Sequence, residues 1–385
     1  MTRVSSIRRT LLPALLVLAV ATAVATAPAA EAGPREVPRG FFGVMYDSVS
    51  LAATDARQVG QHALMARSGV ETVRIGFVWE FLQAGEGDSF DFTYTDRYVR
   101  YAATHGLDVL PVMLYAPPWA RIFPGRRYSP PETRPYLEFL RASIRRYGSR
   151  GSFWREHPGV PRRPLRDWQV WNEPSIRGFW DVGRANARYG FPHGYAQLLR
   201  ASHRVIKRTD ARARTVMAGM VGAAWKELRL LYRAGMGNAF DVAAVHVYPQ
   251  NAKRVAGALR LVRAALDENG GKRKRIYLTE TAFPASRGRV KPISNQRQES
   301  RNGMAKLLAD VYERLIDQRK ALGLDKVFWY TWATSYTHPS SNFEYSGLLR
   351  APGGRSFTPQ PALSAYRRTA RRYQGCAKTS RGACR

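Results

Sequence analysis

Residues 167–174 read Asp-Trp-Gln-Val-Trp-Asn-Glu-Pro, a mostly apolar run that ends in a carboxylate and a proline. Residues 275–280 read Arg-Ile-Tyr-Leu-Thr-Glu and have the same form, an apolar run that leads to a carboxylate. Apolar runs without polar alternation are typical of parallel strands that are buried on both faces. The two segments therefore predict two buried strands, one that leads to Glu173 and one that leads to Glu280.

Short apolar runs of this kind alternate with helical patterns along the chain. We expect strands at Phe41–Tyr46, Thr72–Phe77, Asp108–Met113, Asp167–Trp171, Thr215–Gly219, Val242–Val247, Arg275–Thr279 and Lys326–Thr331. We expect helices at 52–68, 95–105, 135–147, 195–206, 225–234, 252–268, 304–316 and 361–373. This alternation predicts a single α/β domain at residues 33–373, a closed (β/α)8 barrel. An open doubly wound sheet shares the pattern, but no G-x-G-x-x-G turn and no phosphate-binding loop with lysine follows a strand.

Residues 1–32 have the form of a signal peptide. Arginines precede the apolar run Leu11–Ala25, which is shorter than the ~20 residues that a membrane-spanning helix needs. We expect secretion, by the general or the twin-arginine route, and location outside the cell or at its wall; a retained membrane anchor is the alternative. The only cysteines, Cys376 and Cys384, lie in the tail 374–385, where an oxidising compartment favours a disulfide between them.

The formal net charge of the chain is +32, from 61 basic and 29 acidic residues. Such a field attracts anionic cell walls, acidic polysaccharides or nucleic acid, although an arginine-rich solvated surface without a dedicated partner has the same composition. The sequence contains no zinc finger and no glycine-aromatic RNA signature, so we expect no specific nucleic-acid partner. The dispersed histidines have no metal-ligand spacing. We therefore expect a monomer that uses no metal and no organic cofactor.

The two glutamates that follow strands four and seven are candidates for catalysis. In an eight-stranded barrel these strands lie across the mouth from each other, and active sites lie at the carboxyl ends of the strands. Glycoside hydrolysis needs two opposed carboxylates, one protonated and one ionised, and a separation of about 5–5.5 Å gives retention of configuration. The alternatives are that Glu173 stabilises the start of a helix and that Glu280 pairs with one of the many arginines.

Other polar and aromatic residues stand at strand ends. His246 and Tyr248 point the same way by strand alternation, and a tyrosine hydroxyl there would keep a nucleophile ionised; a buried core histidine is the alternative for His246. Arg74 lies inside an apolar run and requires a buried partner, which a carboxylate at the mouth or a structural ion pair would supply. Trp332 is a candidate floor beneath a sugar ring, with core packing as its alternative.

From Phe41 to about Arg372 the chain resembles clan A of the glycoside hydrolases, retaining (β/α)8 enzymes that include families 5 and 39. The resemblance rests most on the Asn-Glu-Pro motif at residues 172–174 together with Glu280. It implies that Glu173 is the acid/base, that Glu280 is the nucleophile and that Asn172 contacts the sugar 2-hydroxyl.

The resemblance also implies which residues bind substrate. Four residues match positions that line the −1 subsite: Arg74, His246, Tyr248 and Trp332. The segment Leu114–Ala120, which contains Trp119, is more similar to family 39, and many family 5 enzymes carry a histidine near the position of Tyr115. This departure leaves the subfamily and the preferred sugar open. Trp119 and other loop aromatics are expected either to line an extended cleft or to cap the barrel.

These observations together predict a secreted retaining glycosidase that cleaves β-glycosidic bonds of a polysaccharide or oligosaccharide, with endo action on a polysaccharide preferred. Uronate-containing glycans belong among the candidate substrates because the chain is basic. One alternative is a non-catalytic barrel that binds carbohydrate or cell wall. Another is an interaction protein for anionic polymers that uses the barrel as a scaffold.

Overall fold

The computed structural model describes residues 1–2, 33–47, 50–184, 188–248, 250–291, 297–337 and 341–376. Most of the predicted leader and of the predicted tail, including Cys384, lies outside these residues. The signal peptide and the disulfide to Cys376 therefore remain predictions. In the described part of the chain, no helix is long and apolar enough to cross a membrane.

Eight parallel strands close into a barrel in the order in which they occur in the chain, as predicted. The strands are β1 (Phe42–Met45), β2 (Thr72–Val78), β3 (Asp108–Leu114), β4 (Asp167–Val170), β5 (Arg214–Val216), β6 (Val242–His246), β7 (Arg275–Thr281) and β8 (Leu324–Trp329). Each strand pairs with its neighbours in sequence, and β8 closes the barrel on β1. The fold is therefore the α/β (β/α)8 barrel and not an open doubly wound sheet.

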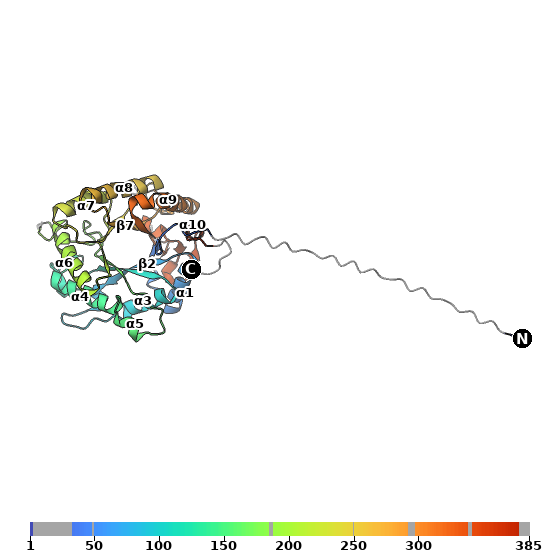
Figure 1. Ribbon diagram of the computed structural model, residues 1–385, viewed down its shortest axis with the longest axis horizontal. Helices are drawn as coiled ribbons and strands as arrows, with labels where there is room; N and C mark the ends of the chain where they lie inside the picture. The colour runs from blue at the N-terminus through green and yellow to red at the C-terminus, as the bar shows by residue number, and fades with distance from the viewer. Residues whose placement is uncertain are drawn as a thin grey trace.

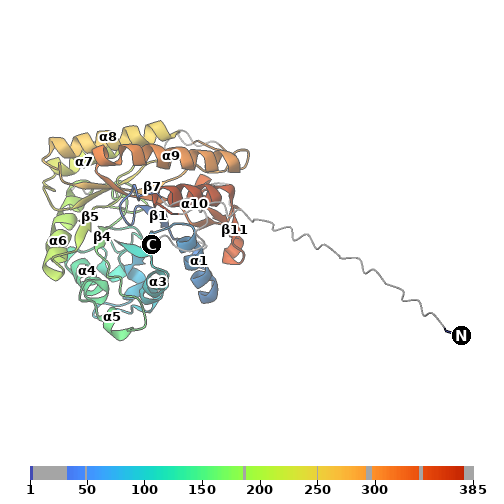
Figure 2. The ribbon, with the colours of Figure 1, turned by 45° about the vertical axis from the view of Figure 1, so that its right-hand side comes forward.

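Helices form a ring outside the barrel (Figure 1). They are α1 (Asp55–Arg67), α2 (Trp79–Leu82), α3 (Thr93–Thr104), α4 (Thr133–Tyr147), α5 (Ser152–Glu156), α6 (His193–Thr209), α7 (Ala224–Arg233), α8 (Ala252–Glu268), α9 (Arg301–Leu322) and α10 (Pro361–Tyr373). Helices α8 and α9 pack side by side, and α10 packs against α9 (Figure 2). Short pieces follow β3 and β8: η2 (Pro118–Ala120), β9 (Ala333–Thr334), η3 (Asn342–Tyr345), β10 (Leu349–Arg350), η4 (Pro352–Gly354) and β11 (Thr358–Pro359).

The apolar side chains form two separate cores. A large one lies between the strands and the helices, and a small one inside the barrel consists of Leu110, Val216, Val242, Ala244, Tyr277 and Phe328. The plug inside the barrel is a packed layer, so the barrel is not a pore. Polar side chains that point inward at the carboxyl ends of the strands therefore lie above an apolar floor.

Three strands end two or more residues away from their predicted carboxyl-terminal residue. The predicted fifth strand reaches Gly219, but β5 ends at Val216, because the hydroxyl of Tyr195 on α6 accepts from the backbone N–H of Ala218 and donates to the carbonyl of Val170 at the end of β4. Strand β7 continues through Glu280, so this glutamate lies within the strand. Strand β8 ends at Trp329, two residues before the predicted end.

Candidate active site

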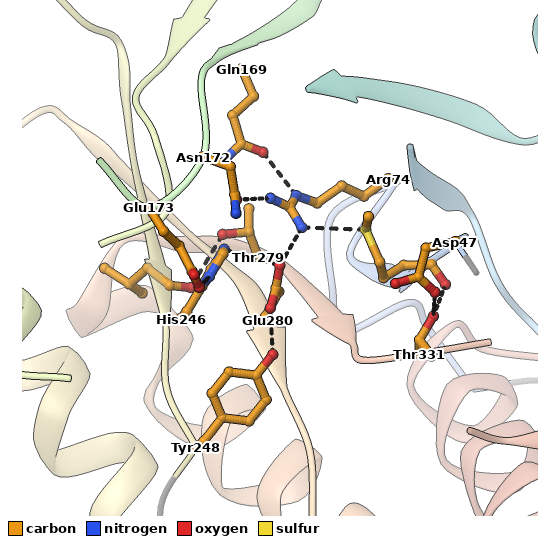
Figure 3. Close-up of polar contacts among 12 residues, drawn as sticks. Asp47, Arg74, Gln169, Asn172, Glu173, His246, Tyr248, Thr279, Glu280 and Thr331 are labelled. Carbon is orange, nitrogen blue, oxygen red and sulfur yellow. Dashed lines mark hydrogen bonds and ion pairs between the residues drawn. The ribbon is translucent and has the colours of Figure 1, made fainter. Parts of the chain in front are cut away.

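Polar side chains from four strands meet at the carboxyl-terminal mouth of the barrel (Figure 3). Arg74 comes from β2, His246 from the end of β6 and Glu280 from β7, and Glu173 follows β4. Hydrogen bonds link Arg74 to Glu280 and His246 to Glu173. The predicted convergence of these four residues on one site is therefore what the geometry shows.

Glu280 is the centre of this network and is only 8% exposed. Its Oε1 accepts a hydrogen bond from Arg74 Nη1 at 2.6 Å, and its Oε2 accepts one from the Tyr248 hydroxyl. Burial works to raise the pKa of Glu280, but the charges of His246 and Arg74 and the Tyr248 hydrogen bond outweigh it and lower the pKa below its usual value. These contacts therefore favour the ionised form of Glu280 in a site that is largely closed to water.

Arg74 is the buried charge that the sequence singled out, and it is 1% exposed. Its guanidinium holds Glu280 through Nη1, Asn172 Oδ1 through Nη2 at 2.7 Å and Gln169 Oε1 through Nε at 2.8 Å. The predicted partner at the barrel mouth is therefore Glu280. Because the planar guanidinium donates in fixed directions, it sets the position of Glu280 relative to Asn172.

Glu173 is oriented by two features. Its Oε1 hydrogen-bonds His246 Nδ1 at 2.5 Å, and its backbone has a φ of 39°, which only a minority of non-glycine residues adopt. His246 is fully buried and lies directly against Gly219, where a Cβ atom would be 2.0 Å from Nε2 of the ring. The absence of a side chain at Gly219 therefore makes room for the imidazole that holds Glu173.

The separation of the two carboxylates decides which chemistry the site allows. Ligand atoms of Glu173, His246 and Glu280 all lie within 4.8 Å of one another, so an oxygen of each carboxylate lies within that distance of the other. Retaining glycosidases need about 5–5.5 Å, and inverting enzymes need about 6.5–9.5 Å to admit a water molecule. The side chain of Glu173 is 12% exposed, so neither carboxylate is sealed beneath the core.

The same three residues also have the composition of a metal-binding cluster. However, the Arg74 guanidinium lies 2.6 Å from Glu280 Oε1, and His246 Nδ1 is already bonded to Glu173. The positive charge of Arg74 so close to the Glu280 carboxylate opposes the binding of a metal cation there. The donor set therefore fits a carboxylate pair served by arginine better than a metal ion.

Asp47 is a third acidic residue at the mouth, and the sequence analysis missed it. Its Oδ1 accepts a hydrogen bond from Thr331 Oγ1 at 2.8 Å, and its carboxyl group also hydrogen-bonds Tyr330. Burial and the nearby charge of Glu280 raise the pKa of Asp47 to about 6. A signal was present, because Asp47 directly follows the predicted first strand, just as Glu280 directly follows the predicted seventh.

Glu227 on α7 is a second missed carboxylate and lies behind Glu173. Burial raises its pKa and the charge of Glu173 adds to this, although hydrogen bonds from Ser175 and from the Val221 backbone work the other way. Nothing in the sequence distinguishes this residue from other helix glutamates. It reaches the site only because α7 packs beside the mouth.

Trp332 does not line the site, which corrects its predicted role as a sugar platform. The residue is fully buried, and its indole N–H donates to Gln61 on α1 at 3.0 Å. Trp332 lies three residues beyond the end of β8 at Trp329. Tyr330 takes its place at the mouth, with its ring edge-on to Tyr248 at a centroid distance of 6.2 Å.

The predicted substrate contact Trp119 lies farther out. Its ring packs edge-on against Trp79, and it lines a hollow between the segment after α2 and the start of α4. Tyr115 lies near Glu173. Burial is the main cause that raises the pKa of its hydroxyl to about 12, and the charge of Glu173 adds to the rise. Its ring stacks on Phe179 with a centroid distance of 6.0 Å. This aromatic pair therefore lies on the Glu173 side of the site.

No protein-family model and no curated protein matches the chain. Its fold matches many solved structures. One is a family 39 glycoside hydrolase from Bacteroides cellulosilyticus, with a TM-score of 0.66 and 17% identity over 87% of this chain; the match spans 64% of that protein, less than two thirds of its length. A second is a monomeric β-xylosidase from Caulobacter crescentus, with a TM-score of 0.60 and 19% identity over 88% of this chain and 69% of that one.

A third is a family 5, subfamily 18 protein from Streptomyces cattleya in complex with Manβ1-4GlcNAc, with a TM-score of 0.63 and 19% identity over 92% of this chain and 83% of that one. Identities this low carry information about the fold alone. Together with the closed barrel, the matches show that this chain has the (β/α)8 fold of the family 39 and family 5 glycoside hydrolases of clan A.

Proposed function

We propose that the protein is a retaining glycosidase that hydrolyses β-glycosidic bonds by double displacement. The observation that carries this proposal is the approach of Glu173 and Glu280 to within 4.8 Å in unequal surroundings. Glu280 is buried against an arginine and a tyrosine hydroxyl, which favour its ionised form. Glu173 is paired with an imidazole and is more accessible from the mouth. Two close carboxylates with different partners match the division of labour between nucleophile and acid/base.

In the first step the Glu280 carboxylate attacks the anomeric carbon while the bond to the leaving oxygen breaks. Glu173 gives its proton to that oxygen, so the departing group leaves as an alcohol and the sugar remains as an ester of Glu280. In the second step Glu173, now ionised, takes a proton from water. The water oxygen attacks the anomeric carbon and releases Glu280 as a carboxylate.

The surrounding residues have roles that follow from their hydrogen bonds. Arg74 and Tyr248 stabilise Glu280 before the attack and after release. His246 bridges the two carboxylates, with Nδ1 bonded to Glu173 and Nε2 3.5 Å from Glu280 Oε1. Asn172 accepts from Arg74 through Oδ1, so its amide N–H group remains to donate to a sugar hydroxyl. Asp47 at the mouth supplies a further acceptor for a hydroxyl.

Aromatic residues on two sides of the carboxylates suit an apolar sugar face. Tyr330, Tyr248 and Phe343 pack edge-on to one another beside Glu280. Tyr115 and Phe179 lie on the Glu173 side, where the leaving group would depart. Aromatic surface on both sides supports a substrate that extends past the cleaved bond. We therefore favour an endo-acting enzyme on a β-linked polysaccharide, exported by means of the leader at residues 1–32.

The test is hydrolysis of a panel of aryl β-glycosides and of neutral and uronate-containing β-glycans. The anomeric form of the first product is read by proton NMR before it equilibrates. We expect a β product from the wild type and no turnover by Glu280→Gln, which keeps the wild-type circular dichroism. An α product, or wild-type activity in Glu280→Gln, contradicts the mechanism. If the protein binds a glycan but hydrolyses no member of the panel, it is instead a carbohydrate-binding barrel.

A further inference from the structure

The end of the barrel opposite the mouth carries three hollows, of about 290, 450 and 510 Å³. The first is lined by Asp108, Asp167 and Arg214, which begin β3, β4 and β5. The third shares Arg214 with the first, and the second is joined to the first by a hydrogen bond from Arg166 to Ser149 at 3.1 Å. The hollows therefore form one continuous region, which we call the basic face.

The basic face is rich in positive charge, and two other hollows are not. Eleven basic and five acidic residues line its three hollows. The hollow near the start of α4 and the one between α8 and α9 are together lined by three basic and six acidic residues. The net charge of +32 is thus not spread evenly over the hollows of the described surface.

Several cations of the basic face are left over after its carboxylates are paired. Asp167 is held by Arg214 and Asp325 by Arg275, while Asp241 pairs with Lys207. Within the described residues, five exposed arginines at the hollows form no ion pair: Arg39, Arg150, Arg208, Arg212 and Arg273. Ion pairs therefore account for the less exposed basic residues of the basic face. They do not account for the exposed arginines, which we call its rim.

The chemistry of the rim fits a polymer of carboxylates. Guanidinium groups bind planar carboxylates through paired hydrogen bonds, and a row of adjoining hollows suits anions spaced along a chain. Single-stranded nucleic acid is bound on exposed aromatic rings, but the one aromatic residue that lines these hollows, Tyr277, is fully buried. No described element here projects like a helix or ribbon that enters a duplex groove.

We propose that the basic face is a binding surface for an acidic polysaccharide, separate from the catalytic mouth. Active sites of (β/α)8 barrels lie at the carboxyl ends of the strands, so a polymer held at the opposite end leaves the mouth free. The surface would keep the protein on an anionic glycan matrix while the mouth acts on its own substrate. This role does not depend on the proposed hydrolysis.

The test measures binding of full-length protein to polygalacturonate at ~150 mM salt and compares two triple variants. One is Arg208→Gln, Arg212→Gln and Arg273→Gln. The other, a control, is Lys253→Gln, Arg254→Gln and Arg301→Gln, three exposed residues at the starts of α8 and α9 near the other end of the barrel. Both triples change the net charge equally.

We expect the first triple to lose about tenfold or more in affinity and to show a shallower dependence on salt, since fewer counterions are released. The control should bind like the wild type. All three proteins should hydrolyse an aryl β-glycoside at the same rate, a readout that is separate from binding. Equal loss in both triples, no binding by the wild type, or tighter binding of duplex DNA than of polygalacturonate would overturn the proposal.

Discussion

Replacing Tyr248 by Phe tests how the site keeps its nucleophile ionised. The change removes the hydroxyl that donates to Glu280 Oε2 and leaves the salt bridge to Arg74 in place. A hydrogen bond to a charged group contributes about 1.5–3 kcal/mol, which corresponds to a rise of about one to two units in the pKa of Glu280. The pKa of the nucleophile in the free enzyme sets the acid limb of the pH profile of kcat/KM. This limb should therefore move to higher pH by the same amount.

The expected loss therefore depends on pH. At pH values below the acid limbs of both proteins, kcat/KM of the wild type should exceed that of Tyr248→Phe by about 10- to 150-fold. The ratio should shrink toward neutral pH, where Glu280 is ionised in both proteins. The assay is kcat/KM for an aryl β-glycoside across the acid range, with Tyr232→Phe as the control, because the hydroxyl of Tyr232 has no hydrogen-bond partner in the described structure. A ratio that stays constant with pH would refute the assignment of this hydroxyl.

Three further predictions concern other residues of the site. Glu173→Ala should slow glycosides with poor leaving groups by about 10²–10⁴-fold, slow activated aryl glycosides less, and form a β-glycosyl azide when azide is added; chromatography that shows no azide product would count against Glu173. Gly219→Ala forces the His246 ring to move, since the new Cβ would lie 2.0 Å from Nε2. It should cost about 1–3 kcal/mol of stability in urea unfolding and lower kcat, whereas Gly60→Ala, in open space, should do neither. The pKa of Asp47 is raised to about 6, so its contribution to stability is present at low pH and is lost as pH rises through 6. Asp47→Asn should accordingly stabilise the protein by up to about 3 kcal/mol at pH 8 but not at pH 3, while kcat/KM falls; equal effects at both pH values would contradict this.

The fold could be read from the sequence because each element carries its own periodic signal. The bounds of α8 and α10 match the predicted ranges 252–268 and 361–373, since their apolar stripes begin and end with the helices. The two glutamates could be found for the same reason. Each stands at the carboxyl end of a buried strand, and the topology of a barrel brings the ends of such strands together.

The errors arose where a contact distant in sequence decides the local structure. The indole N–H of Trp332 donates to the side chain of Gln61 on α1, which lies 271 residues earlier, and no local pattern in the sequence indicates that hydrogen bond. The end of β5 is set by a hydroxyl on α6. Asp47 was missed for a different reason: one acidic residue after a strand is common, and only its burial and the approach of Glu280 give this one a raised pKa.

The most direct test of the carboxylate pair is to trap the covalent intermediate. A 2-deoxy-2-fluoro β-glycoside with a good leaving group, chosen from the best substrate of the panel, slows release of the ester more than its formation. Mass spectrometry of the intact protein and of its peptides should show one sugar attached, on the peptide that contains Glu280, and Glu280→Gln should show none. Turnover of glycosides with no adduct, or with the sugar on another residue, would contradict the account.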